Sequence, residues 1–124
     1  HVAILTGPTN TYGLMHRNSK FKFWALDSTS MVQESNAQIN LGSWMHLAAR
    51  RDNGAGSQGS YSIFVNGSHD QTLGRNTQPT TGATLNVGRV FGGTHYFQGA
   101  LDDLRIYDRV LSAAEAKALH DLGQ

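Results

Sequence analysis

The sequence predicts an all-β domain of short antiparallel strands that ends in one short helix. Fourteen glycines against two prolines in 124 residues indicate a chain rich in turns. Short β-branched and aromatic runs recur about every ten residues between clusters of Gly, Asn, Asp and Ser, which is the rhythm of a sandwich or barrel. After residue 111 the spacing of apolar residues changes to that of a helix.

Nine segments have the composition of strands. They lie near residues 2–6, 11–16, 20–26, 30–35, 43–51, 60–66, 69–74, 83–89 and 98–107. The pair at 60–74 is expected to form a hairpin, because Asn66 and Gly67 end a β-branched run and both tolerate the positive φ of a type I′ turn.

Alternation within the segment 20–26 predicts which side chains face the core. One set contains Phe21, Phe23 and Ala25, and the other contains Lys20, Lys22 and Trp24. Because a face with two lysines cannot be the core, we expect Trp24 to be partly exposed. In the segment 98–107 the same parity places Asp102 on the inner face with Leu104 and Ile106, where a carboxylate needs a partner.

The last element is a helix expected at about 113–121. Ser112 and Glu115 form a capping box, in which each side chain reaches the backbone N–H of the other residue. Alanines follow, and Gly123 suits the end of the helix.

Composition excludes several classes of function. The formal net charge is +1, from ten Lys and Arg against nine Asp and Glu, which disfavours nucleic acid as a partner. The lack of cysteine excludes disulfides, a thiolate nucleophile and Cys-ligated metals. No apolar run approaches the ~20 residues of a membrane span, so we expect no membrane insertion. The first strand-like run begins at residue 2, so we expect no signal peptide within these 124 residues.

Four blocks of sequence resemble those of a known family. In order, they are WMHLA at 44–48, YSIFVNG at 61–67, LNVGR at 85–89 and YFQGALDDLRIYDRVLS at 96–112. Their order and spacing resemble the concanavalin A-like, laminin G-type jelly roll that is common in bacterial secreted proteins. The resemblance implies a two-sheet antiparallel jelly-roll sandwich and an extracellular or cell-surface location.

The start of the chain departs from this family. Members usually begin with a strand that carries an aspartate- and glycine-containing motif, and it normally pairs beside the strand expected here at 98–107. Because nothing of this kind precedes His1, we expect residues 1–124 to be a single laminin G-like domain truncated at its N-terminus. A second copy in a homo-oligomer or a missing N-terminal segment would then cover the open edge, unless this is a reduced variant whose edges are protected differently.

The acidic residues argue against catalysis. Several glycoside hydrolases and polysaccharide lyases share the fold, and a retaining glycosidase needs two carboxylates on one face. The only glutamates are Glu34 and Glu115, the second is used in the helix cap, and Asp102 and Asp103 are neighbours that face opposite sides. We therefore expect no enzymatic activity. The six histidines lack metal-ligand spacing, and His46 is expected to be a hydrogen-bonded scaffold residue.

The resemblance implies two kinds of site. In the family, an acidic residue of the closing strand often helps to hold a structural calcium ion, which maps first to Asp102 and then to Asp103. The alternative is that Asp102 accepts hydrogen bonds from loop N–H groups without a metal.

The second kind of site binds carbohydrate through an aromatic platform and polar partners. The candidates are Trp24, Lys22, Tyr12, Arg50 and Tyr96. Trp44 resembles the packing tryptophan of the family and is not among them. The predicted function is a non-catalytic recognition or adhesion module for a glycan or cell-surface polysaccharide. The first alternative is a structural or assembly module that pairs with another chain through an open sheet edge. A glycoside hydrolase or polysaccharide lyase of the same fold is the less favoured alternative.

Overall fold

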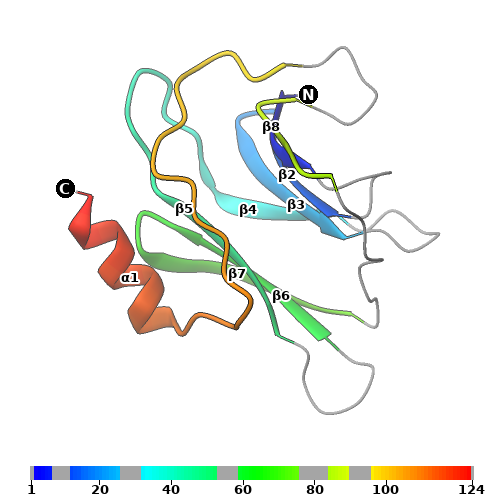
Figure 1. The fold of residues 1–124 in the computed structure, drawn as a ribbon, viewed down its shortest axis with the longest axis vertical. Helices are drawn as coiled ribbons and strands as arrows, with labels where there is room; N and C mark the ends of the chain where they lie inside the picture. Colours follow the sequence, from blue (N-terminus) through cyan, green and yellow to red (C-terminus); the bar gives the residue numbers. More distant parts are fainter. Residues whose placement is uncertain are drawn as a thin grey trace.

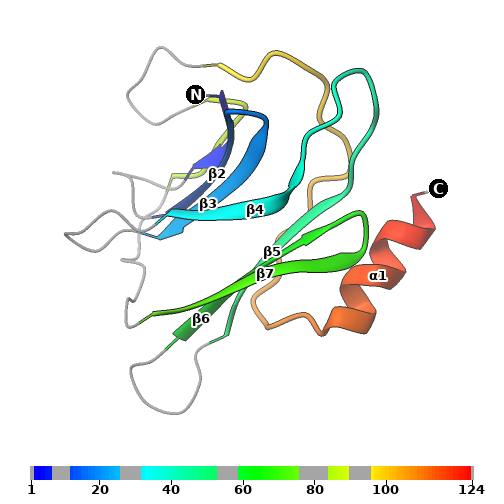
Figure 2. The ribbon, with the colours of Figure 1, turned by 180° about the vertical axis from the view of Figure 1, so that it is seen from behind.

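A computed structural model describes residues 2–6, 12–25, 32–52, 59–75, 84–89 and 96–123. Two antiparallel β-sheets face each other, and a C-terminal helix packs on the smaller sheet (Figure 1). Seen from behind, the helix again lies on the side of the smaller sheet that points away from the larger one (Figure 2). The predicted antiparallel sandwich with one short helix is confirmed.

The larger sheet has five strands in the order β4-β3-β2-β1-β8, and the smaller has three in the order β5-β6-β7. The larger sheet contains β1 (Val2–Thr6), β2 (Tyr12–Arg17), β3 (Lys20–Ala25), β4 (Val32–Gln38) and β8 (Asn86–Val87). The smaller sheet contains β5 (Leu47–Asp52), β6 (Gly59–Val65) and β7 (Ser68–Arg75). Each of these strands overlaps a segment in which a strand was expected.

The predicted hairpin of β6 and β7 is confirmed, and so is its turn. Asn66 has φ 48° and Gly67 has φ 75°, which are the two positive values of a type I′ turn. The turn between β2 and β3 has the same character, with φ 53° at Asn18 and 59° at Ser19. Both short turns keep consecutive strands side by side.

The core lies between the sheets. Phe21 of β3 packs with Ile63 and Val65 of β6, and all three are buried. Partly buried apolar residues surround this cluster: Ile4, Phe23, Ala37, Ile39, Met45 and Leu47. The predicted inner position of Phe21 is confirmed. Lys22, its neighbour, instead forms an ion pair with Glu34 of β4.

Strand β6 is buried on both faces. Ile63 faces the larger sheet, while the next residue, Phe64, is 1% exposed on the opposite face. Helix α1 (Ala113–Leu122) contacts the smaller sheet, and its residue Ala116 is also buried. The smaller sheet is thus the middle layer between the larger sheet and the helix.

Residues 97–111 do not form the expected strand. The segment, called the crossing segment below, runs from the β8 edge of the larger sheet past the smaller sheet to α1 (Figures 1 and 2). Phe97 N–H donates to the Gly88 carbonyl at 2.7 Å, but no described strand pairs with residues 98–107. A strand needs a neighbour for its ladder, so the strand-like pattern alone does not make one. Asp102 is exposed and does not face inward as predicted.

Helix α1 begins as predicted. Glu115 N–H donates to Ser112 Oγ at 3.1 Å, and Ser112 N–H donates to a carboxylate oxygen of Glu115 at 2.8 Å. At the other end, Gly123 N–H donates to the His120 carbonyl. Within the residues that the structure describes, no helix has the length and hydrophobicity needed to cross a bilayer.

Candidate functional site

The structure places the five predicted carbohydrate-binding residues in separate surroundings. Tyr12 and Trp24 belong to β2 and β3, but their side chains lie outside what the structure describes. Lys22 Nζ lies 2.9 Å from a carboxylate oxygen of Glu34, and its side chain is only 15% exposed. The hydrogen bond from Lys22 lowers the pKa of the Glu34 carboxyl. Lys22 is therefore already engaged within the sheet.

Arg50 has a structural role in this arrangement. Its Nη1 donates to the Leu111 carbonyl at 2.7 Å, and its guanidinium lies 5.2 Å from the centre of the Phe64 ring. These contacts attach the end of the crossing segment to β5. The guanidinium thus holds two parts of the fold together.

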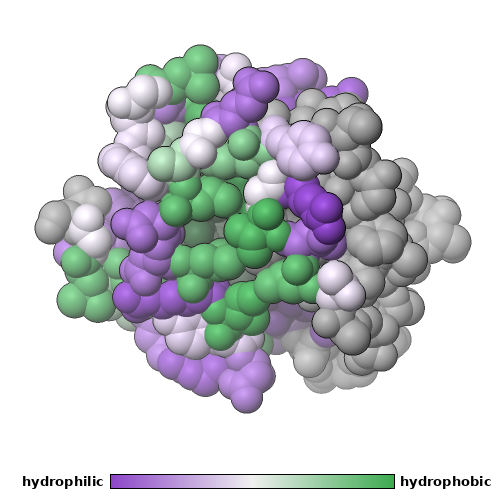
Figure 3. Space-filling view, turned by 45° about the horizontal axis from the view of Figure 1, so that its top comes forward, coloured by the Kyte–Doolittle hydropathy of each residue, from purple (hydrophilic) through white to green (hydrophobic). Residues whose placement is uncertain are grey.

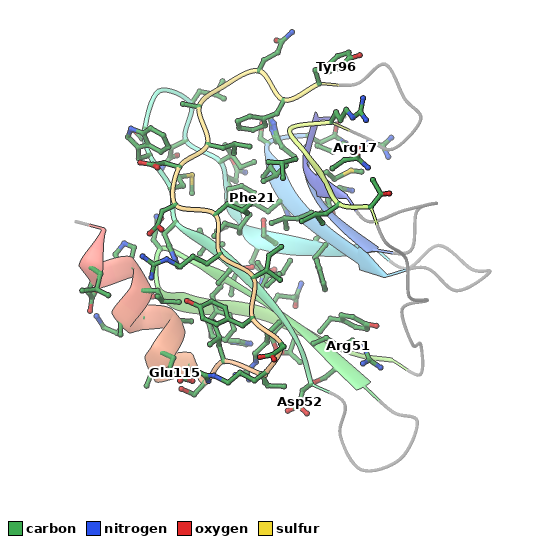
Figure 4. The ribbon with its side chains drawn as sticks, viewed as in Figure 1. Arg17, Phe21, Arg51, Asp52, Tyr96 and Glu115 are labelled. Carbon is green, nitrogen blue, oxygen red and sulfur yellow. The ribbon has the colours of Figure 1, made fainter. Side chains whose placement is uncertain are left out.

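Tyr96 is 61% exposed and lies far from that contact. It forms an isolated β-bridge with Arg89. Figure 4 shows Tyr96 near the start of the crossing segment and Glu115 in the first turn of α1, just past its other end. Tyr96 and Arg50 therefore do not converge on one ligand.

Asp102 and Asp103 use their carboxylates locally. Asp102 Oδ1 accepts the backbone N–H of Asp103 at 2.8 Å, and Asp103 Oδ1 accepts Arg105 Nε at 2.8 Å. A guanidinium at this distance competes with a cation for the carboxylate. Across the ranges that the structure describes, no three His, Asp or Glu side chains gather as metal ligands. The described residues do not fit a calcium site here, and calcium stays a prediction of the resemblance.

Both glutamates have structural partners. Glu34 pairs with Lys22, and Glu115 caps α1 while also lying 2.7 Å from Arg109 Nη2. The hydrogen bond from Arg109 is the largest cause that lowers the pKa of Glu115 to about 2, and the Ser112 backbone N–H adds to it. Glu34 belongs to β4 and Glu115 to the first turn of α1, and they form separate ion pairs.

The turn between β4 and β5 exposes a tryptophan that the sequence was expected to bury. Trp44 is 70% exposed and Leu41, at the start of the turn, is 86% exposed. Gly42 has φ 80°, which allows the chain to reverse there. The Leu-Gly-Ser sequence before Trp44 was the available signal, because a glycine turn commonly carries its neighbours to the surface.

The base of this turn is well anchored. Ile39 N–H donates to the Ser19 carbonyl at 2.8 Å, and Asn40 N–H donates to Met45 Sδ at 3.3 Å. On the other side, His46 N–H donates to Asn66 Oδ1 at 3.0 Å. Trp44 is therefore presented from a turn that is fixed at both ends.

His46 has a less complete set of partners than expected for a scaffold residue. Its Nδ1 is buried and has no hydrogen-bond partner within the described part of the chain, so the expectation of a hydrogen-bonded side chain is wrong for this atom. The ring meets that of His120 in α1 edge to face, with 5.7 Å between centres. Burial is the largest cause that lowers the pKa of His46, and His120 adds to it.

Hydrophobic side chains gather on one area of the surface, with hydrophilic ones beside them (Figure 3). The crossing segment exposes several large hydrophobic residues: Leu101, Leu104, Ile106, Tyr107 and Val110. Where it approaches α1, a shallow groove is lined by Tyr107, Arg109, Leu111, Glu115, Ala118, Leu119 and Leu122. Among the described residues, this surface and the Trp44 turn both expose large hydrophobic side chains to solvent.

Comparison with known proteins identifies the family. Residues 2–117 match the model of the concanavalin A-like lectin/glucanases superfamily. The chain belongs to this superfamily. A comparison with curated proteins found no match. Among solved structures, part of an S-layer domain-containing protein from Clostridium thermocellum is similar, with 24% identity and a TM-score of 0.48. The match covers 88% of this chain and 55% of that structure.

Proposed function

We propose that this domain is a non-catalytic recognition module that binds carbohydrate on the cell surface or outside the cell. The observation that carries the proposal is the 70% exposure of Trp44 on an anchored turn. A large ring in water presents a flat apolar face, and the C–H face of a sugar ring can cover it. Because the turn is fixed, little conformational freedom is lost on binding.

Polar groups flank the ring in the same turn. Asn40 and Ser43 are both exposed, and they offer an amide and a hydroxyl. Sugar hydroxyls need such directional partners beside a stacking surface. The concanavalin A-like superfamily is named for lectins as well as glucanases. Together these features support a carbohydrate as the ligand.

The arrangement of carboxylates supports the non-catalytic part of the proposal. Glu34 and Glu115 are the only glutamates of the chain, and each is tied to a basic partner. A glycosidase needs two carboxyl groups about 5–10 Å apart across one bond. Asp103 is paired with Arg105, which leaves it poorly placed as a general acid.

Affinity gel electrophoresis against a panel of polysaccharides tests the proposal. We expect at least one polysaccharide to retard the wild type, and Trp44→Ala to weaken that binding about tenfold, the loss of one stacking contact. Leu41→Ala is the matched control, because it removes an apolar side chain of the same turn without removing a ring. Wild-type mobility that no polysaccharide changes would count against carbohydrate binding. Full binding by Trp44→Ala with loss in Trp24→Ala would assign the platform to Trp24.

A further inference from the structure

Two cations face each other across the turn between β2 and β3. Arg17, the last residue of β2, lies directly opposite Lys20, the first residue of β3, with only Asn18 and Ser19 between them. Residues opposite each other in an antiparallel pair have Cβ atoms about 5 Å apart and side chains on the same face. Arg17 is exposed and Lys20 is half-buried. Because like charges in this position destabilise a hairpin, the stability of the turn does not account for the pair.

Alternation places both cations on the outer face of the larger sheet. Phe21 of β3 points into the core, so its neighbours Lys20 and Lys22 point away from the smaller sheet. Lys22 lies opposite Glu34 of β4, and the two form an ion pair at 2.9 Å. Glu34 is the one acidic residue in β2, β3 and β4. These three strands therefore bring three cations and a single carboxylate to this face.

The carboxylate of Glu34 does not balance these cations. The hydrogen bond from Lys22 is the largest cause that lowers the pKa of Glu34, and the charges of Lys20 and Arg17 lower it further, so all three lie near it. Within the part of the chain that the structure describes, the side chains of Arg17 and Lys20 form no ion pair of their own. The net charge of the whole chain is only +1, so positive charge is concentrated at this place.

The turn with the two cations adjoins the turn that presents Trp44. Ile39 N–H donates to the Ser19 carbonyl at 2.8 Å, which joins the two turns directly. Lys20 also lies opposite Gln38, the last residue of β4 before the Trp44 turn. Figure 1 shows both turns at the same end of the molecule. A chain of several sugars bound at Trp44 can therefore extend toward the two cations.

We propose that the ligand of this domain is an acidic polysaccharide, whose anionic groups bind between Arg17 and Lys20. This inference rests on the proposed carbohydrate function and names the class of the ligand. A guanidinium donates two parallel hydrogen bonds to a carboxylate or a similar oxyanion, and the ammonium on its other side adds a point charge. An anion between the two side chains also offsets their mutual repulsion. A neutral glycan supplies neither interaction.

Binding to immobilised polymers of different charge tests the class of the ligand. The probes are polygalacturonate for carboxylates, dextran sulfate for sulfate esters and neutral dextran, which shares its backbone with dextran sulfate. We expect at least one acidic polymer to bind about tenfold more tightly than dextran at about 0.15 M salt, and less tightly as the salt concentration rises. The tighter acidic polymer identifies the anionic group.

Two results would overturn the inference. If neutral polysaccharides bind and neither acidic polymer binds more tightly, the ligand is not acidic, although the carbohydrate proposal stands. If a single-stranded oligonucleotide binds as tightly as the acidic polymers, any polyanion suffices, and the site is not one for polysaccharide.

Removal of single charges tests the site. We expect Arg17→Gln and Lys20→Gln each to weaken binding of the acidic polymer about tenfold, and Lys20→Arg, which keeps the charge, to bind like the wild type. Lys117→Gln is the matched control, because it lowers the net charge by the same amount on α1, beyond the smaller sheet. An equal loss in Lys117→Gln would mean that only the net charge matters. Unchanged binding by Arg17→Gln and Lys20→Gln would place the anion elsewhere, and either result would overturn the site.

Trp44→Ala, measured with the same acidic polymer, separates this inference from the proposed function. Weaker binding in Trp44→Ala and in both charge variants supports the two together. Weaker binding in the charge variants alone supports the anion site and counts against Trp44 as the platform. Weaker binding in Trp44→Ala alone overturns the anion site and leaves the platform. Thermal melting without polymer confirms folding, and neither Arg17→Gln nor Lys20→Gln should melt below the wild type, because each removes a contact between like charges.

Discussion

Asn36 in β4 donates two hydrogen bonds to Asp70 in β7, one from its backbone and one from its side chain. Asp70 Oδ2 accepts the Asn36 backbone N–H at 2.6 Å, and the Asp70 carbonyl accepts Asn36 Nδ2 at 3.0 Å. The other carboxylate oxygen accepts the Ala37 N–H at 2.8 Å. Nearby, Gln71 Nε2 donates to the Glu34 carbonyl. These contacts join β4 and β7, which are edge strands of the two sheets.

We expect Asp70→Asn to lower the free energy of unfolding by about 2 kcal/mol. Hydrogen bonds to a charged group contribute about 1.5–3 kcal/mol each, and the partial exposure of this site reduces that value. An amide can replace only one of the two acceptor oxygens. Chemical denaturation measures the change, with Asp108→Asn in the exposed crossing segment as the control. Equal stability of both variants would show that the sheets do not depend on this link.

The elements that the sequence predicted well are those fixed by neighbouring residues. Asn66 and Gly67 determine the β6–β7 turn, and Ser112 and Glu115 determine the start of α1. Alternation in β3 correctly placed Phe21 inside. In each case the physical cause lies within a few residues of the feature itself.

The failures concern features fixed by distant parts of the chain. The alternation of residues 101–107 is the same whether or not a partner strand lies beside them, so it could not reveal that no described strand does. Nor does the sequence around Arg50 reveal that its guanidinium donates to the carbonyl of Leu111, 61 residues away. For Trp44 the Leu-Gly-Ser turn before it was a local signal of exposure, but the resemblance to a packing tryptophan pointed the other way.

The contact between His46 and His120 predicts that stability falls in mild acid. The pKa of His46 lies below its ordinary value of 6.5, chiefly because of burial. The unfolded chain therefore takes up a proton first as the pH falls below about 6.5, and the folded state loses stability until its own lowered pKa is reached. Above 6.5 this contribution is fully present.

Melting temperatures between pH 8 and about pH 5 test this dependence. Several charges face His46 or its partner: Asp103 and Arg105 from the crossing segment, and Asp121 beside His120. We expect His46→Gln to flatten the decrease below pH 6.5, and His16→Gln in the other sheet to leave it unchanged. If the melting temperature of His46→Gln still falls below pH 6.5 as it does in the wild type, a group other than His46 causes the decrease.

The helix cap predicts a second loss of stability in stronger acid. Arg109 and the Ser112 N–H hold the pKa of Glu115 at about 2, below its ordinary value of 4.5. The stabilisation from this carboxylate is therefore full above pH 4.5 and disappears as the pH falls toward 2. We therefore expect the helical circular dichroism signal of the wild type to decrease as the pH falls from 4.5 toward 2. In Glu115→Gln the helical signal should be lower at pH 6 and nearly independent of this titration.

Two glycines with similar backbones allow the packing of α1 to be measured separately from backbone strain. Gly67 has φ 75° and Gly42 has φ 80°, so an alanine at either position is strained by about 1 kcal/mol. A Cβ at Gly42 would have no atom within 4 Å, whereas one at Gly67 would lie 3.0 Å from the Cβ of His120.

We therefore expect Gly67→Ala to destabilise the fold by about 1–2 kcal/mol more than Gly42→Ala, because the added Cβ makes a tight contact in a packed region. The difference in unfolding free energy between the two variants, taken from denaturation curves, removes the common backbone term. Hydrogen exchange of the α1 amides locates the effect, because only Gly67→Ala pushes against the helix. Equal losses in both variants would mean that the last turn of α1 shifts freely away from the β6–β7 turn.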